Sequence, residues 1–283
     1  MRVIKKQYFI VFWAIVLILS AIFFRYDLDI SKSVFNRTST FGRIFEVIGE
    51  YPNSFALIIG ASWIFGATKK TRKLVSIQSL VLFLISGVGW GGLTLFSWEH
   101  YHIDDVEITF KVLFICGIIS VIGDALVLYL FTTFNDKILK KYVEFALLAV
   151  LTAILNLMLV NIIKVFWGRM RFRDMGLNYD LFSRWLFPQG LTGNKSFPSG
   201  HTANATTIIV LLPATKIIDK KKKLLKAFLY ILIFAWPITV AISRVIVGAH
   251  FASDVLFGMA STVTIFYFLS NKMLKQETHV LKN

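Results

Sequence analysis

The chain has 283 residues, of which 56% are hydrophobic, and its mean hydropathy is +0.68. A soluble domain contains about 45–50% apolar residues, so the composition argues against an ordinary soluble protein. The formal net charge of +15 would suit a nucleic-acid partner only if the basic residues formed one continuous face. Long apolar blocks divide them instead, which indicates a membrane protein without a nucleic-acid partner.

The apolar blocks predict about eight membrane spans, because most of them approach the roughly 17–25 residues that cross a bilayer core. In chain order they cover residues 8–24, 54–67, 75–97, 112–133, 143–163, 202–215, 227–247 and 255–270, and the second and sixth are short. Backbone groups in lipid must be satisfied within the chain, which favours helices. We therefore expect an all-α, polytopic transmembrane helix bundle of six to eight spans, in one integral-membrane domain over residues 1–283.

The basic residues predict the orientation of this bundle. They gather before the first span, at residues 69–73, 137–141 and 216–226, and after the last span. Connections rich in Lys and Arg stay on the cytoplasmic side of a membrane. Both termini are therefore expected in the cytoplasm of a multi-pass cell-membrane protein. Cys116 is the only cysteine and lies in a predicted span, so it forms no internal disulfide.

Two connections on the opposite side are not spans. Residues 25–53 carry an amphipathic pattern that suits a segment lying in the membrane interface. Residues 164–200 form a longer connection, rich in Arg, Gly, Phe and Trp. Long connections of this kind are usually functional or disordered, and this one is too aromatic for disorder. We therefore expect the chemistry of the protein in this connection.

Three clusters of polar residues end on this same side of the membrane. They are Lys164 with Arg171, then Pro198-Ser199-Gly200-His201, then Ser243-Arg244 followed by His250 and Asp254. Two spans joined by the basic run 216–226 separate the second cluster from the third, so the chain returns to the side it left. The fifth span delivers the first cluster there as well. Topology alone therefore brings all three clusters to one membrane face, the outer one.

The basic and small residues of these clusters suit a phosphate group. Arg171 and Arg244 offer planar paired donors, and Lys164 offers a point charge. Ser199 and Gly200 precede a predicted helix, whose N-terminal N–H groups favour an anion. Taken singly, each residue also has a simpler interpretation. Lysine and arginine commonly extend from span ends to the interface, and serine commonly caps a helix.

The remaining residues suit catalysis. Asp254 lies four residues after His250, a spacing that lets the two side chains meet on a helix. The carboxylate can hold one ring nitrogen and leave the other as a nucleophile. His201 can then protonate the leaving oxygen as a general acid.

The pattern Lys-x6-Arg, Pro-Ser-Gly-His and Ser-Arg-x5-His-x3-Asp resembles the type 2 phosphatidic acid phosphatase and haloperoxidase superfamily. The resemblance covers a core of about residues 143–271. It implies that His250 attacks phosphorus and forms a phosphohistidine, that Asp254 orients His250, and that His201 is the acid. It also implies that phosphate is held by Lys164, Arg171, Ser199, Gly200 and Arg244, with no metal or other cofactor. The family usually has proline after the arginine of its first motif, and here that residue is Phe172.

The leading interpretation is a phosphatase acting on a membrane lipid phosphate or pyrophosphate, with its site on the extracellular or periplasmic side. A phosphotransferase of the same family is the first alternative. A transporter using Asp124, a carboxylate within a predicted span, is a second. A metal site is a third, formed by His100, His102, Asp104 and Asp105. Three questions stay open: which lipid is the substrate, how the chain oligomerises, and whether Arg169, Arg173, Arg184 and Lys195 extend the anion site or contact lipid phosphates.

Overall fold

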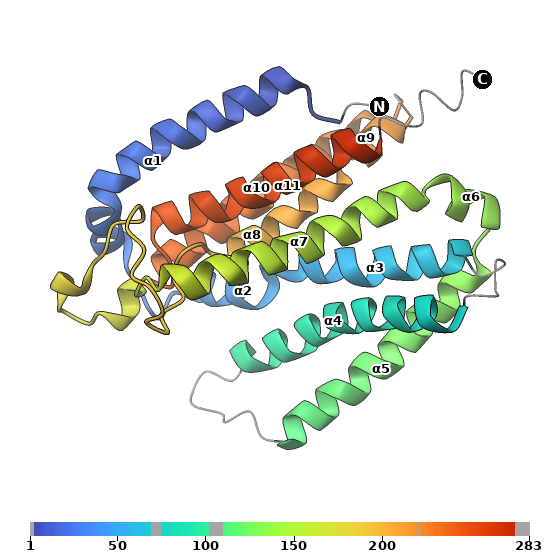
Figure 1. The fold of residues 1–283 in the computed structure, drawn as a ribbon, viewed down its shortest axis with the longest axis horizontal. Coiled ribbons are helices and arrows are strands. Elements are labelled where there is room, and N and C mark those ends of the chain that lie inside the picture. Colours follow the sequence, from blue (N-terminus) through green and yellow to red (C-terminus); the bar gives the residue numbers. More distant parts are fainter. Residues whose placement is uncertain (1–2, 69–74, 102–109, 220, 275–283) are drawn as a thin grey trace.

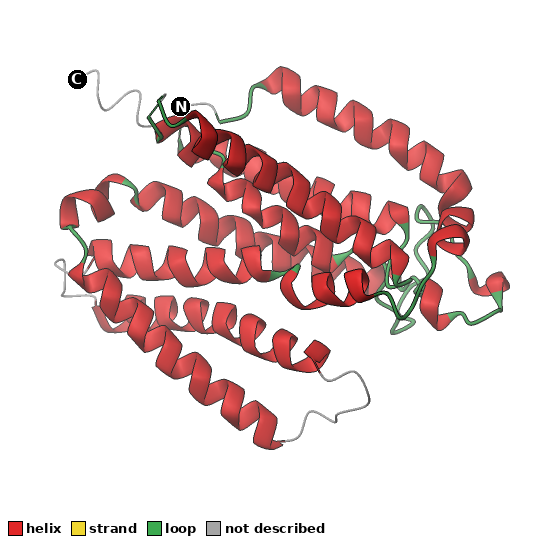
Figure 2. Ribbon diagram, turned by 180° about the vertical axis from the view of Figure 1, so that it is seen from behind, coloured by secondary structure: helices red, strands yellow, loops and turns green. Residues whose placement is uncertain are grey.

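The computed structural model describes residues 3–68, 75–101, 110–219 and 221–274. These ranges consist of helices joined by turns and loops, and they contain no strand (Figure 2). The predicted all-α fold is confirmed. The elements are α1 (Lys6–Val34), α2 (Thr40–Ile48), α3 (Tyr51–Thr68), α4 (Val75–Tyr101), α5 (Phe110–Thr133), α6 (Asp136–Lys141), α7 (Val143–Trp167), η1 (Phe172–Asp174), η2 (Tyr179–Leu181), α8 (Gly200–Thr206), η3 (Thr207–Leu211), α9 (Ala214–Ile217), α10 (Lys223–Ile246) and α11 (Ala252–Met273).

Five helical segments are long and apolar enough to cross a membrane, which fits a multi-pass membrane protein. They are Lys6–Val34, Phe114–Thr133, Val143–Asp174, Lys223–Ile246 and Ala252–Met273. The other three predicted spans are helical as well. Helices α3 and α4 cover the second and third, whereas the sixth is divided among α8, η3 and α9. The count of eight spans therefore stays a prediction.

Polar side chains explain why the predicted sixth span is broken. Thr202, Asn204, Thr206 and Thr207 are all buried, and the hydroxyl of Thr207 donates a 2.9 Å hydrogen bond to Asn53 of α3. Helix α8 ends after seven residues, and the tighter helix η3 continues from it. Polar groups at membrane depth are stable when protein surrounds and bonds them. The part of this segment formed by α8 and the start of η3 is therefore packed inside the bundle.

The helices form a bundle around α8 and η3 (Figure 1). Both segments contact α3, α7, α10 and α11. Helix α1 packs along α11 on one side of the bundle, and α4 and α5 pack against α3 on the other. The largest apolar cluster includes Leu148, Ile209, Ile233 and Phe266, so α7, η3, α10 and α11 share one core.

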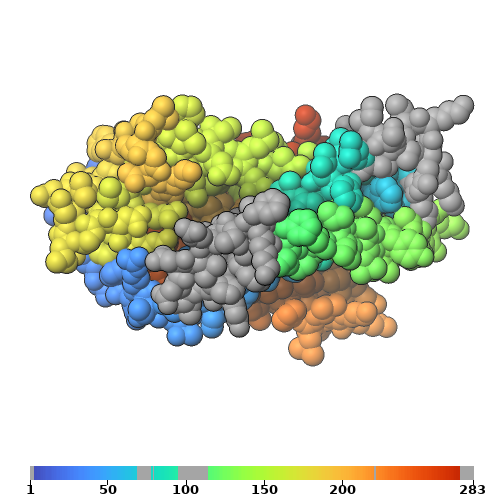
Figure 3. Space-filling view, turned by 90° about the horizontal axis from the view of Figure 1, so that it is seen from below, coloured from blue at the N-terminus to red at the C-terminus, as the bar shows by residue number. Residues whose placement is uncertain are grey.

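The two ends of the bundle have different character. At one end Val3 packs with Leu274, and Nζ of Lys216 in α9 donates a 3.0 Å hydrogen bond to the carbonyl of Val3. At the other end lie α2 and the connection between α7 and α8 (Figure 1). In the space-filling view this connection, in yellow, meets the N-terminal segment, in blue (Figure 3).

Candidate active site

A polar cavity of about 320 Å³ opens at this second end, between the end of α7, the start of α8 and the turn before α11. Its lining includes the predicted site residues Lys164, Arg171, Gly200, His201 and His250. The other predicted site residues, Ser199, Arg244 and Asp254, are fully buried beside this lining. The structure therefore brings the three sequence clusters together at one cavity.

His250 lies in the turn before α11 and is buried, with 2% of its surface exposed. Its Nδ1 atom lies 2.7 Å from the backbone carbonyl oxygen of Ser196. A carbonyl only accepts, so Nδ1 carries the proton and donates it. Burial lowers the pKa of His250 to about 3, and the nearby Lys164 charge adds to this effect while Asp254 opposes it. The ring is therefore neutral near pH 7, with an unprotonated Nε2 that can act as a nucleophile.

Asp254 contacts His250 less closely than Ser196 does. Its Oδ2 atom lies 3.8 Å from Nδ1 of His250. The same oxygen accepts a 2.6 Å hydrogen bond from the Ser196 hydroxyl and a 2.9 Å bond from the N–H of Phe251. Asp254 thus caps α11 and fixes Ser196, whose carbonyl in turn orients the ring of His250.

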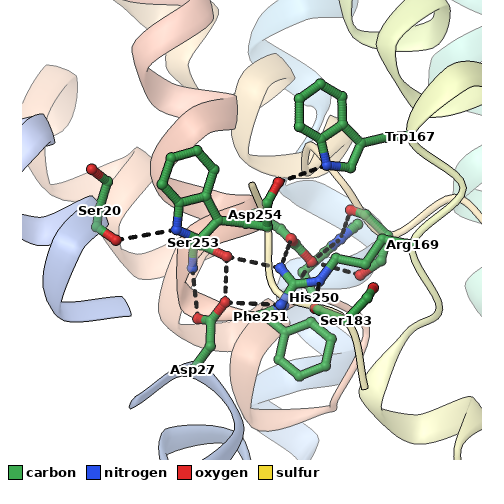
Figure 4. A network of polar contacts seen from close by, with 11 residues as sticks. Ser20, Asp27, Trp167, Arg169, Ser183, His250, Phe251, Ser253 and Asp254 are labelled. Atoms are coloured by element: carbon green, nitrogen blue, oxygen red, sulfur yellow. Dashed lines mark hydrogen bonds and ion pairs between the residues drawn. The ribbon is translucent and has the colours of Figure 1, made fainter. Parts of the chain in front are cut away.

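Arg169 joins the polar network around Asp254 (Figure 4). It is fully buried, and its Nη1 atom lies 2.5 Å from Oδ1 of Asp254. Its Nη2 atom lies 3.0 Å from Oδ2 of Asp27 in α1, and the Phe251 ring lies 4.1 Å from the guanidinium. Asp27 also accepts a 2.9 Å hydrogen bond from the N–H of Ser253. Arg169 therefore joins α1 to α11 and does not extend the anion site.

His201, in the first turn of α8, has a different partner. Its Nδ1 atom lies 2.9 Å from Oε1 of Glu50, in the short connection between α2 and α3. Burial by itself would raise the pKa of Glu50, but the charge and hydrogen bond of His201, with help from Asn204 and Lys164, hold it at about 2. Glu50 is therefore an ionised carboxylate that accepts a hydrogen bond from the Nδ1–H of His201. The ring of His201 lines the cavity beside His250.

The first residues of α8 leave room for the ammonium group of Lys164, which comes from α7. The Ser199 hydroxyl accepts a hydrogen bond of 3.3 Å from the N–H of Thr202 and caps the helix. A side chain at Gly200 would place its Cβ atom 3.0 Å from Nζ of Lys164. Glycine at this position lets the ammonium group approach the start of α8. The pairing suits an anion held between Lys164 and the backbone of Gly200.

Arg244, near the end of α10, is fully buried and attaches α2 to the cavity. Its Nη1 atom lies 3.1 Å from Oε1 of Glu46, and Nη2 donates to the carbonyl of Gly42. Glu46 lines the cavity and lies 3.7 Å from Arg173, another lining residue. Arg244 was predicted to hold phosphate. In this structure its guanidinium is paired with Glu46.

Comparison with known proteins identifies the region that carries these residues. Residues 145–277 match the family model of the PAP2 superfamily. No curated protein and no solved structure matched the chain. The match contains all three sequence clusters and confirms the resemblance that their spacing predicted. Members of the PAP2 superfamily are generally phosphatases.

Phe172 stands at the position where the resemblance to the superfamily leads us to expect a proline. Its side chain is 3% exposed, and its ring centre lies 5.1 Å from that of Phe35 and 6.2 Å from that of Phe251. Arg171 is extended, with ψ of 149°, and η1 begins at Phe172. A proline would restrict this turn by locking φ. Here the aromatic burial of Phe172 anchors the turn instead, and Arg171 still lines the cavity.

Three carboxylates at or beside the site were not found by sequence reasoning: Asp27, Glu46 and Glu50. All three precede residue 145, where the match to the PAP2 superfamily begins. The sequence held one usable signal, because Glu46 and Glu50 lie four residues apart in the amphipathic connection 25–53, a spacing that puts helical side chains on one face. Nothing local indicated that Glu50 would meet His201 or that Glu46 would meet Arg244.

Other candidates from the sequence lie elsewhere. Asp124 is buried in α5 and lines a separate cavity of about 290 Å³ with Thr94 and Ser120. Arg184 lies over the ring of Phe24, 4.8 Å from its centre, and Lys195 is exposed.

Within the described residues, no three His, Cys, Asp or Glu side chains come together as ligands for a metal ion. The alternative metal site at His100, His102, Asp104 and Asp105 lies outside the residues whose side chains are described.

Proposed function

We propose that this chain is a membrane phosphatase that hydrolyses a phosphate or pyrophosphate monoester of a lipid through a phosphohistidine on His250. One observation supports this most strongly: two histidines share a cationic cavity, but one donates Nδ1–H to a neutral carbonyl and the other to a carboxylate. The first environment suits a neutral nucleophile and the second suits a protonated acid. This pairing is what hydrolysis of a phosphate ester requires.

In the first step, Nε2 of His250 attacks phosphorus and the bond from phosphorus to the ester oxygen breaks. The leaving oxygen takes a proton from His201 and departs as an alcohol, or as a lipid monophosphate when the substrate is a pyrophosphate. Lys164 and Arg171 balance the charge of the phosphoryl oxygens in the transition state. Because these cations are already placed, little reorganisation is needed when the charge develops.

In the second step, water attacks the phosphohistidine and the bond from phosphorus to nitrogen breaks. His201, now neutral, takes the proton from that water, as microscopic reversibility of acid catalysis requires. Phosphate leaves, and both rings return to their starting protonation states. A phosphotransferase would follow the same route with another acceptor in place of water.

A lipid substrate suits the position of the cavity. Its wall includes Leu157, Val160, Asn161 and Lys164, from the last turns of α7, which lies in a candidate span. A head group can therefore enter while its chains stay in the bilayer. The basic run 216–226 lies near the opposite end of the bundle, and the positive-inside rule assigns that end to the cytoplasm. The cavity then opens on the extracellular or periplasmic face, and both termini are cytoplasmic.

The substrate is tested by phosphate release from the purified protein in mixed micelles. Phosphatidate, phosphatidylglycerol phosphate, a polyprenyl pyrophosphate and lipid A form the panel. We expect release from at least one of them and a phosphorylated protein intermediate after rapid acid quench. Transfer of phosphate to an added alcohol without release would favour the phosphotransferase. No reaction with any member of the panel would contradict the proposal.

The roles of the two histidines are tested with two leaving groups. His250→Ala should abolish turnover of lipid phosphates and of nitrophenyl phosphate, and it should leave no phosphohistidine. His201→Ala should lose about 10²–10⁴-fold on lipid phosphates, the usual contribution of general acid catalysis. It should recover much of that loss with nitrophenyl phosphate, whose leaving group is stable as an anion. Rescue of His250→Ala in place of His201→Ala would reverse the two assignments.

The orientation is tested by cysteine labelling in intact cells, after replacement of the single native cysteine, Cys116. A cysteine at Asn178 should react with a membrane-impermeant reagent, and a cysteine at Lys221 should react only after permeabilisation. Both positions are exposed in the structure. Labelling at Lys221 but not at Asn178 in intact cells would overturn the orientation.

A further inference from the structure

Glu50 lies at the cavity but far from the catalytic clusters in the sequence. It sits between α2 and α3, before the residues that match the PAP2 superfamily, and it is 6% exposed. Both of its carboxylate oxygens meet α8. Oε1 lies 2.9 Å from Nδ1 of His201, and Oε2 accepts a 2.9 Å hydrogen bond from the side-chain amide of Asn204. The carboxylate of Glu50 thus contacts both His201, the proposed general acid, and Asn204, one turn further along α8.

The partners of Glu50 differ from those of the carboxylate near His250. Asp254 pairs with buried Arg169, 2.5 Å away, which also pairs with Asp27 at 3.0 Å. Glu50 instead meets the neutral amide of Asn204 and the ring of His201. His201 is the charged group in direct contact with Glu50, and the charge of Lys164 also acts on that carboxylate. A carboxylate oxygen 2.9 Å from Nδ1 favours a protonated ring. Such a ring is the form that a general acid needs before the leaving oxygen departs.

The position of Glu50 is fixed by the core of the bundle. Asn156 of α7 donates a 3.1 Å hydrogen bond to the amide oxygen of Asn204, and Thr262 of α11 donates a 2.8 Å bond to the amide oxygen of Asn156. On the other side, the indole N–H of Trp236 donates to the carbonyl of Gly49 at 3.3 Å. Four helices, α7, α8, α10 and α11, therefore hold the carboxylate in place.

We infer that Glu50 is the positioning residue of the general acid: its carboxylate fixes the ring of His201 and keeps it protonated for transfer to the leaving oxygen. The inference rests on the proposed function, because it assigns a partner to the proposed acid. Glu50 itself exchanges no proton and does not touch the phosphoryl group. The N-terminal third of the chain thereby supplies a residue on which the chemistry of the matched region depends.

The test uses Glu50→Gln, which retains an oxygen acceptor for Nδ1 and removes the charge. We expect kcat on a lipid or alkyl phosphate to fall about 10²-fold, within the range of general acid catalysis, with KM little changed. With nitrophenyl phosphate most of that loss should disappear. The alkaline limb of the kcat profile should also move to lower pH, because the protonated ring has lost its counter-charge. Glu50→Asp retains the charge, so its alkaline limb should stay near that of the unmodified protein.

Glu46→Gln is the matched control. Glu46 is one helical turn away and lines the same cavity, but its carboxylate pairs with Arg244 at 3.1 Å. Its effect should be the same for good and poor leaving groups. In a His201→Ala background, Glu50→Gln should add no further loss on the alkyl phosphate. Equal losses on both substrates, or an additive loss in the double variant, would overturn the inference.

Failure of the inference can be told from failure of the proposed function. If the unmodified protein forms phosphohistidine on His250 and His201→Ala shows the leaving-group rescue, the proposed function stands whatever Glu50→Gln does. Phosphohistidine formation from nitrophenyl phosphate also shows that Glu50→Gln is folded. If that variant does not fold, the same comparison is made with Glu50→Asp, whose shorter side chain should lower kcat on the alkyl phosphate and spare nitrophenyl phosphate.

Discussion

His250 and His201 each direct Nδ1 to an oxygen atom, but the two oxygens differ in charge. The carbonyl of Ser196 is neutral and lies 2.7 Å from His250, whereas the carboxylate of Glu50 is ionised and lies 2.9 Å from His201. Exposure differs too, since the His201 side chain is 19% exposed and that of His250 is 3% exposed. Two identical side chains in one cavity therefore have different surroundings, which is the basis of the different roles that we propose for them.

The carboxylates near the two rings have different neighbours. Asp254 is paired with Arg169, which also pairs with Asp27, so one buried guanidinium serves two carboxylates. Glu50 has no such arginine among its hydrogen-bond partners, His201 and Asn204. A carboxylate near a histidine does not by itself predict an imidazolium, because burial of the ring and the other partners of the carboxylate also count. The cation that pairs with Asp254 is buried Arg169.

The largest expected effect comes from removing that cation. Arg169→Met leaves Asp27 and Asp254 buried without their shared partner, and breaking a buried pair in this way costs about 3–5 kcal/mol of unfolding free energy. Activity should fall with it, because Asp254 no longer fixes Ser196. Unfolding in detergent micelles measures the first effect and phosphate release the second.

Arg173→Met is the matched control for this prediction. Arg173 is 24% exposed and lies 3.7 Å from Glu46. Partly exposed pairs of this kind contribute about 0–1 kcal/mol, so stability should change little. If the two methionine variants were equally stable, the buried network would not have the structural importance that we assign to it.

The next effect concerns Asp254 itself. Asp254→Asn should reduce kcat on the order of 10²-fold, less than the ~10⁴-fold loss of the serine-protease triad when its aspartate becomes asparagine and the histidine takes the wrong tautomer. The reason is that the carbonyl of Ser196 still holds the proton on Nδ1 of His250. Steady-state kinetics on the best lipid substrate measures the change.

Ser196→Ala tests separately how much the link between Asp254 and Ser196 contributes. It removes the hydroxyl that donates to Asp254 at 2.6 Å but retains the carbonyl that accepts from His250 at 2.7 Å. We expect a smaller loss, of about tenfold, the size of one hydrogen bond to a charged group. A loss in Ser196→Ala that matches or exceeds that of Asp254→Asn would contradict this order.

A smaller effect appears in the pH dependence of stability. The pKa of His250 falls from an ordinary 6.5 to about 3 on folding, so the unfolded chain binds the proton more readily. The contribution of a neutral His250 is fully present above pH 6.5 and is lost as pH falls toward 3, at up to about 1.4 kcal/mol per pH unit. His250→Gln lacks this titration. The unfolding free energy of the unmodified protein should therefore decline relative to the variant below pH 6.5, and parallel curves would show that the ring is not buried in its neutral form.

The smallest effect is expected from metal removal. Lys164 and Arg171 supply the positive charge at the cavity, so treatment with EDTA should leave phosphate release largely unchanged. Phosphate release is measured before and after dialysis against the chelator. Loss of activity that a divalent ion restores would contradict a metal-independent mechanism. It would also direct attention to His100, His102, Asp104 and Asp105.

The sequence determined much of the cavity. The motifs of Lys164, His201 and His250 lie at the ends of predicted spans, and each crossing of a bilayer fixes the side on which the next motif emerges. A membrane topology therefore converts spacing along the chain into position in space. That is why the phosphate-binding and catalytic candidates could be placed at one face before the fold was known. The break of the predicted sixth span was harder to see, because its length and apolar content resemble those of a short span.

Only the tertiary structure decided which carboxylate serves which histidine. Glu50 and Asn204 are 154 residues apart, and Asp27 and Ser253 are 226 apart, yet each pair forms a hydrogen bond. No helical period connects such positions, because periodicity reports only neighbours on one helix. Burial makes these contacts important for stability, because a charge removed from water is costly unless another group in the protein pairs with it. The packing of α1 against α11, and of the α2–α3 connection against α8, supplies these partners, and the sequence contains no local sign of either contact.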